Sequence, residues 1–214
     1  MANPTAFPGD IVVSGDVRLS GSISPVKART NVLAISENAQ FTIPWHWWRI
    51  WNSATNASLP GTAASNDDLA LVMGTFATAP PSIQGFDVGG DASYEAFARA
   101  QIPMPWDYAA GQGVTLRFHA GMLTTVASVS AALDVLAYET DEEVGLVGSP
   151  TDICGTAAQS INSTTLADID FTITPTSLVA GDLLDVRIAI NCNSADTAVM
   201  IPVIGAVKML YDAR

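Results

Sequence analysis

The sequence predicts an all-β protein, an antiparallel β-sandwich of the jelly-roll type, preceded by an extended glycine-repeat arm. Three observations lead to this fold class. Apolar and polar residues alternate at a period of two in several segments, turn residues separate those segments, and no window carries a capped helical period. About eight short strands in about 175 residues are typical of two packed sheets.

The chain opens with a six-residue repeat at 9–24, GDIVVSGDVRLSGSIS, in which Gly9, Gly15 and Gly21 share one phase. One copy of so thin a repeat cannot bury its apolar side, whereas three chains wound about a common axis can. The alternatives are a hairpin or edge strand packed on the body, and an arm that adds a strand to a partner's sheet. In the three-chain arrangement, a homotrimer, the interior residues are Ile11, Val13, Val17, Leu19 and Ile23.

The distribution of charge also separates an N-terminal part of the chain from the rest. The 214 residues carry a formal charge of −12, but 1–36 is at +1 and 37–214 at −13. We therefore expect an N-terminal arm over 1–36 and a jelly-roll domain over 37–214. So few basic residues argue against nucleic acid as a partner, and no apolar run is long enough for a membrane helix. The arm's basic residues are predicted to contact an acidic surface, and they are Arg18, Lys27 and Arg29.

Strands are predicted in order along the domain, each as a run of period-two alternation between turn signals. The C-terminal part, 166–191, reads as strand, turn and strand, which we interpret as a hairpin-like pair at a sandwich edge. In its second strand Leu184 and Val186 would point inward and Asp185 and Arg187 outward. The predicted strands are 69–76, 93–102, 114–120, 129–138, 166–174, 183–191 and 199–211.

Tryptophan is concentrated in FTIPWHWWRIW at 41–51. Taken as one strand, this segment has bulky residues on both faces, so both faces are expected to be covered. Packing in the core or at a subunit interface is one interpretation, because aromatic residues and arginine are enriched there. The other is that exposed tryptophans stack on sugar rings, and the candidates for that role are Trp48 and Trp106.

Residues for catalysis are not found. The histidines, His46 and His119, lack partners at ligand spacing, and no GxSxG, P-loop or CxxC motif is present. Cys154 and Cys192 are expected to be reduced thiols. A calcium site built from Asp168 and Asp170, with Asp182 or Asp185, is a weaker alternative. The sequence therefore predicts no enzyme, no catalytic residue, no cofactor and no metal.

Several phrases are similar to a known group of proteins, among them GDVRLSGSI, FTIPWHWWRIWNSATNASLPGTAASNDDLALVMGTF and AGDLLDVRIAI. They resemble tailed-bacteriophage capsid decoration, cement or head-fibre proteins built on a jelly roll. The resemblance implies a structural virion protein, made in the host cytoplasm, that binds the major capsid protein on the capsid exterior and stabilises the shell. It identifies no site residue. The alternative is a glycan- or receptor-binding module of a phage head or tail fibre. A glycan-active enzyme and a non-viral structural protein are further alternatives.

Overall fold

The computed structural model describes residues 39–52, 57–87, 93–124, 129–140, 151–175, 177–194 and 199–213. The glycine repeat and the predicted boundary near residue 36 lie outside these residues and stay predictions. The same holds for the residues predicted to form the trimer or to contact the capsid, which are Ile11, Val13, Val17, Arg18, Leu19, Ile23, Lys27 and Arg29.

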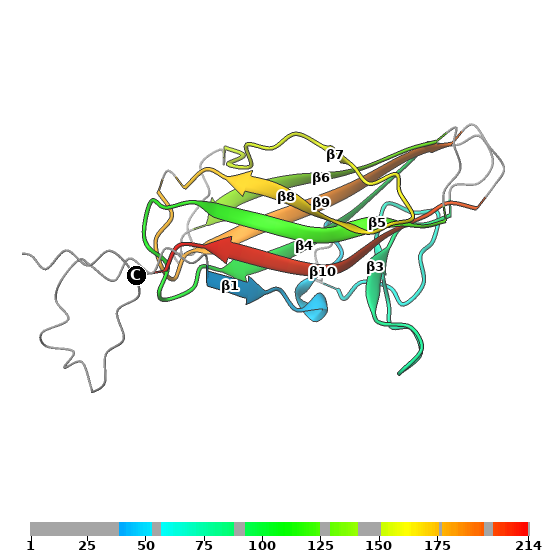
Figure 1. The fold of residues 1–214 in the computed structure, drawn as a ribbon, viewed down its shortest axis with the longest axis horizontal. Coiled ribbons are helices and arrows are strands. Elements are labelled where there is room, and N and C mark those ends of the chain that lie inside the picture. Colours follow the sequence, from blue (N-terminus) through cyan, green and yellow to red (C-terminus); the bar gives the residue numbers. More distant parts are fainter. Residues whose placement is uncertain are drawn as a thin grey trace, which may run out of the picture. The chain divides into compact units, whose positions relative to one another are not determined.

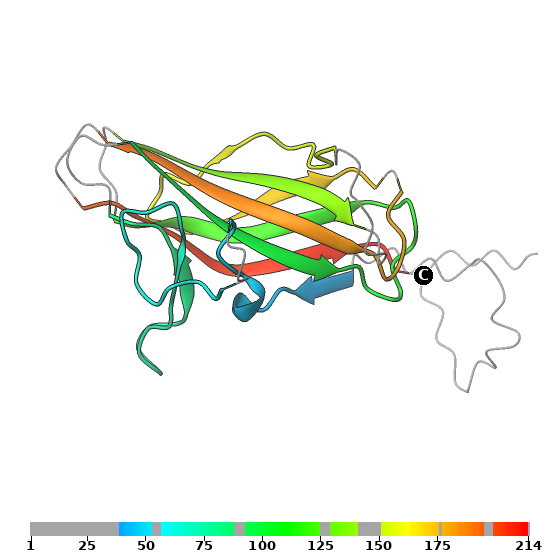
Figure 2. The same cartoon turned by 180° about the vertical axis from the view of Figure 1, so that it is seen from behind.

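The described residues form two antiparallel sheets, which lie one over the other in Figures 1 and 2. The β10 sheet has the order β2-β3-β10-β5-β8, with β1 also on β10, and the β9 sheet has the order β4-β9-β6-β7. No helix among the described residues is long and apolar enough to cross a membrane. The strands are β1 (Ala39–Thr42), β2 (Ala70–Val72), β3 (Ser82–Gln84), β4 (Ser93–Pro103), β5 (Val114–Thr124), β6 (Val129–Thr140), β7 (Gln159–Ser160), β8 (Ala167–Ile173), β9 (Leu183–Ser194) and β10 (Ile201–Tyr211).

The connections between these strands are those of a jelly roll. The chain passes from β4 in one sheet to β5 in the other, returns to β6 and β7, crosses to β8, returns to β9 and ends in β10. The long strands thus pair mainly with partners distant in sequence, whereas β2–β3 and β6–β7 are consecutive pairs, and the two sheets close over one core. The predicted fold class, an all-β antiparallel sandwich, is confirmed, and the long strands lie close to their predicted ranges.

Alternation along the strands places the core between the sheets. In β9, Leu184, Val186 and Ile188 are fully buried, whereas Asp185 and Arg187 keep part of their surface. The inward and outward faces predicted for this strand are therefore confirmed. Aromatic rings fill the middle of the core: those of Trp48 and Phe118 lie 6.3 Å apart, and those of Phe118 and Phe171 lie 5.7 Å apart, edge to face.

The single strand expected over 41–51 is wrong beyond Thr42. Strand β1 ends there, and Pro44, with φ of −65°, precedes a short 3₁₀ helix, η1 (Trp45–Trp47). Proline has no N–H for a sheet ladder, and its fixed φ suits the start of a helical turn. The amide of Trp47 donates to the carbonyl of Pro44 at 3.0 Å. The turn breaks the alternation, so the tryptophans do not divide between two faces of a strand.

The hairpin expected within 166–191 is also wrong. Strand β8 pairs with β5 in the β10 sheet, while β9 lies in the centre of the β9 sheet between β4 and β6. The turn between them carries the chain from one sheet to the other. Asp182 holds this turn, because its carboxylate accepts a hydrogen bond from the amide of Val179 at 2.7 Å.

Candidate functional site

The free edge of β4 is covered by two segments that come from the start of the domain. Arg49 and Arg99 exchange backbone hydrogen bonds of 2.8 and 3.0 Å, and Phe97 pairs in the same way with the segment at 67–69. These contacts protect an edge strand that would otherwise expose unpaired amides. They also place the tryptophan-rich segment, 45–51, beside the outer face of the β9 sheet.

Three arginines lie in one row across this edge. Arg49 is opposite Arg99, and Arg99 is opposite Arg187 on β9, so the three side chains share the outer face. We call this set the arginine row. Arg99 forms a two-pronged ion pair with Asp185, its Nε donating at 2.6 Å. This hydrogen bond raises the pKa of Arg99 above its ordinary value, so its guanidinium stays charged.

Arg187 is held by aromatic rings. Its guanidinium carbon lies 5.7 Å from the ring centre of Trp51 and 5.0 Å from that of Phe97. The two rings lie 4.7 Å apart, and the indole of Trp51 donates to the carboxylate of Asp67 at 3.2 Å. Stacking of this kind fixes the orientation of a guanidinium without neutralising its charge.

A surface hollow of about 350 Å³ lies beside the arginine row. We call it the Trp47 hollow. Its lining includes one tryptophan, two arginines and one glutamine, and it includes no aspartate or glutamate. The lining residues are Trp47, Arg49, Ile50, Arg99, Ala100, Gln101 and Pro103. Asp185, which pairs with the lining residue Arg99, is not itself among the lining residues.

The structure separates the two tryptophans predicted to stack on sugars. Trp48 is only 1% exposed and packs against Phe118, so stacking of a sugar on Trp48 is excluded. It is buried because η1 turns the chain inward directly before it. Trp106 is 87% exposed in the loop after β4 and stays a candidate. The structure adds Trp47 and Trp51, which the sequence placed in the same cluster without distinguishing them.

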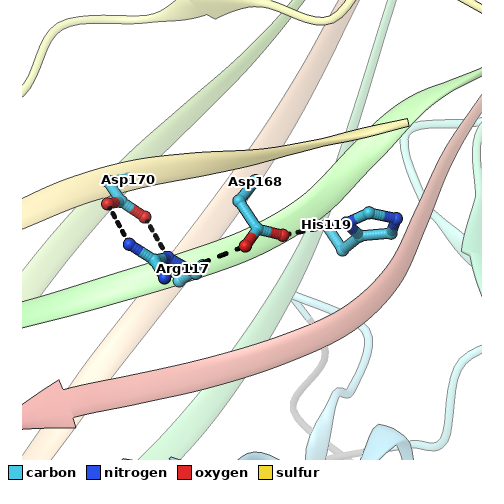
Figure 3. A network of polar contacts seen from close by, with 4 residues as sticks. All are labelled: Arg117, His119, Asp168 and Asp170. Carbon is cyan, nitrogen blue, oxygen red and sulfur yellow. Dashed lines mark hydrogen bonds and ion pairs between the residues drawn. The ribbon is translucent and has the colours of Figure 1, made fainter. Parts of the chain in front are cut away.

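A second polar network lies on the outer face of the β10 sheet (Figure 3). Arg117 donates to both carboxylate oxygens of Asp170 at 2.7 Å, and the Nδ1 of His119 lies 2.8 Å from Asp168. Of the two further candidate calcium ligands, Asp185 belongs to the opposite sheet, and Asp182 lies in the turn between β8 and β9, where its carboxylate accepts the hydrogen bond from the amide of Val179. No cluster of three or more metal-ligating side chains occurs among the described residues. The calcium alternative is therefore wrong for this group, because the guanidinium of Arg117 holds both carboxylate oxygens of Asp170 and no third metal ligand lies with them among the described residues.

Acid is expected to weaken the fold partly through Asp170. Its hydrogen bonds to Arg117 lower the pKa of this carboxyl below the ordinary 3.8. Because the pKa of Asp170 is lower in the folded than in the unfolded state, its ionised carboxylate stabilises the fold above pH 3.8. This stabilisation is lost as the pH falls through the folded-state pKa. Thermal melts of wild type and Asp170→Asn should therefore differ more at about pH 7 than at about pH 2. An equal difference at both pH values would contradict this role.

The two cysteines are free, as predicted. Burial raises the pKa of Cys192 to about 12, and Cys154 is half-buried with its pKa also raised. Because the thiolate is the reactive form, iodoacetamide at about pH 8 should leave Cys192 unmodified in the folded protein and modify it in urea. Mass spectrometry of the digested protein measures this. Modification of Cys192 at equal rates with and without urea would show that β9 is not buried there.

Comparison with known proteins gives similarity in structure only. No family model and no curated protein matches the chain. Among solved structures, it is similar to the xylan-binding module CBM15, with 15% identity over 83% of this chain and 99% of that one, and a TM-score of 0.38. It is also similar to the CBM22-1 xylan-binding domain of Paenibacillus barcinonensis Xyn10C, with 14% identity over 72% and 86% and a TM-score of 0.37.

The enzymatically active domain of bacteriophage CBA120 tailspike protein 4 is a third similar structure. It shares 14% identity over 69% of this chain and 18% of the tailspike chain, with a TM-score of 0.37.

Proposed function

We propose that this chain is a carbohydrate-binding protein and that its ligand lies on the outer face of the β9 sheet, at the Trp47 hollow. One observation carries the proposal: Trp47, Arg49, Arg99 and Gln101 line one open hollow. An indole offers a flat apolar surface to the C–H face of a sugar ring. Guanidinium and amide N–H groups donate to the hydroxyl oxygens around the ring.

The dimensions of the hollow agree with this ligand. A volume of about 350 Å³ lies at the lower end of the range of small-molecule sites, about 300–1,000 Å³. It is lined in part by the rigid strand β4, whose edge is fixed by the backbone hydrogen bonds of Arg49 and Phe97. A site on a rigid strand loses little conformational entropy when it binds.

We propose binding without turnover. Glycoside hydrolysis most often uses a pair of carboxyl groups on either side of the scissile bond. The lining of the Trp47 hollow has no carboxylate, and the nearby Asp185 is held by Arg99. The groups present can orient a sugar, but none of them is placed to protonate a leaving group or to activate water.

Of the functions predicted from the sequence, carbohydrate binding corresponds to the alternative, a glycan- or receptor-binding module of a phage head or tail fibre. The capsid-decoration role and the homotrimer stay predictions, because the residues that would carry them lie within 1–36. Native mass spectrometry of the full chain and of a chain lacking 1–36 tests them. A trimer that becomes a monomer on truncation would support the repeat as the trimerisation element. A monomer in both cases would speak against it.

A glycan array with the full chain tests the proposed function directly. We expect binding to a limited set of related glycans. The melting temperature of the protein should rise with the concentration of a glycan that binds on the array, since a ligand that binds only the folded state stabilises it. Binding to no glycan on a broad array, by a chain shown to be folded, would contradict the proposal.

A further inference from the structure

The arginine row is a cluster of positive charge in a protein whose formal net charge is −12. The described residues contain five lysines and arginines, and three of these are Arg49, Arg99 and Arg187. Adjacent positions of a sheet place them side by side, where like charges destabilise the pairing. Such an arrangement becomes favourable when an anion lies on it.

Internal carboxylates neutralise only one member of the row. Asp185 pairs with Arg99, whereas Arg49 donates at 2.6 Å to the neutral hydroxyl of Ser58. Arg187 forms no ion pair among the described residues, and its buried Nε has no hydrogen-bond partner there. Two of the three guanidinium groups therefore keep an uncompensated charge.

Other acidic side chains do lie on the same face but do not reach these guanidinium groups. Asp134 is two residues along β6 from Leu136, which is opposite Arg187, and it forms no ion pair with Arg187. Asp67 is engaged by the indole of Trp51. The positive charge is thus local to the arginine row and to the Trp47 hollow. The acidic residues around them should repel a polyanion that does not fit this small site.

We propose that the ligand of this site is an acidic saccharide, one whose sugar rings carry carboxylates. Guanidinium groups match the planar carboxylate and bind it with two parallel hydrogen bonds. The indole of Trp47 takes the sugar ring and Arg49 takes a carboxylate within the Trp47 hollow. Arg187 does not line the hollow but is opposite Arg99, which does, so it would take a carboxylate of a neighbouring sugar along the row. This inference rests on the proposed function and adds the chemical class of its ligand.

The test compares polygalacturonate with the same polymer after chemical reduction of its carboxyl groups, using isothermal titration calorimetry on the full chain. We expect the acidic polymer to bind and the reduced polymer to bind at least about tenfold more weakly, since hydrogen bonds to charged groups contribute about 1.5–3 kcal/mol. Binding of the acidic polymer should weaken as salt is added.

Variants locate the effect. Arg49→Gln and Arg187→Gln should each weaken binding of the acidic polymer about tenfold to hundredfold. Arg187→Lys keeps the charge but loses the planar fork, so it should also bind weakly while it folds normally. Arg117→Gln is the matched control, because it removes the same charge from the opposite sheet. It should leave the affinity unchanged.

The outcomes separate this inference from the proposed function. Equal binding of a neutral xylan or galactan, unaffected by Arg187→Gln, would overturn the acidic ligand and leave carbohydrate binding in place. Binding of no saccharide, acidic or neutral, would overturn both. An equal loss in Arg117→Gln and Arg187→Gln would overturn the site, because it would show a general charge effect. Equal binding of dextran sulfate would overturn the preference for carboxylates.

Discussion

Replacement of Trp48 by alanine is expected to lower the free energy of unfolding by about 3–5 kcal/mol, the range for a large aromatic removed from a core. Trp48 is 1% exposed and packs against Phe118, so its loss opens a cavity between the sheets. Its indole N–H has no partner among the described residues, so little hydrogen bonding is lost with it. Urea unfolding of wild type and variant measures the difference.

Trp106 provides the matched control for that measurement. It is the same residue type but 87% exposed, and exposed substitutions usually change stability by less than about 0.5 kcal/mol. Trp106→Ala should therefore unfold at the same urea concentration as wild type. If Trp48→Ala were as stable as Trp106→Ala, the burial of Trp48 and the turn at Pro44 that produces it would be wrong.

Replacement of Trp47 by alanine is expected to weaken glycan binding about thirtyfold or more. Aromatic residues at the centre of a binding site commonly contribute about 2 kcal/mol or more, and 1.4 kcal/mol corresponds to a factor of ten. Trp47 is half-buried against Phe41, with ring centres 5.6 Å apart, and its exposed part lines the hollow. Titration calorimetry with the best glycan from the array measures the loss.

Two controls show whether such a loss is local. Trp47→Phe keeps an aromatic face and should retain most of the affinity, while thermal melting shows that both variants are folded. Trp106→Ala should bind as wild type does if the site is the Trp47 hollow. The opposite pattern, with binding lost in Trp106→Ala and kept in Trp47→Ala, would place the glycan on the β4–β5 loop.

The fold could be read from the sequence where local pattern determines structure. Period-two alternation gave the long strands and their inward faces, because every second residue of a half-buried strand must be apolar. The pairing of strands could not be read in this way. The sequence suggested that β8 and β9 form a hairpin, but a crossing between sheets and a hairpin turn use the same residue types, and Asp182 suits both.

The candidate site could not be predicted from the sequence either, because it too depends on which strands pair. Arg49, Arg99 and Arg187 lie 50 and 88 residues apart along the chain and meet only through strand register. The tryptophan cluster was a usable signal for the segment at 45–51, but a strand was assumed there. Pro44 is the residue that argues against such a strand, because proline has no amide for a sheet ladder.

We have proposed that a saccharide binds to the outer face of the β9 sheet. Amide chemical shifts measured while an oligogalacturonate is added test it most directly, because they report the contacted backbone residue by residue. We expect the largest shifts at 47–51, 97–103 and 185–187, around the arginine row and the Trp47 hollow. Shifts confined to the loop around Trp106, or to the outer face of the β10 sheet around Arg117, would contradict it.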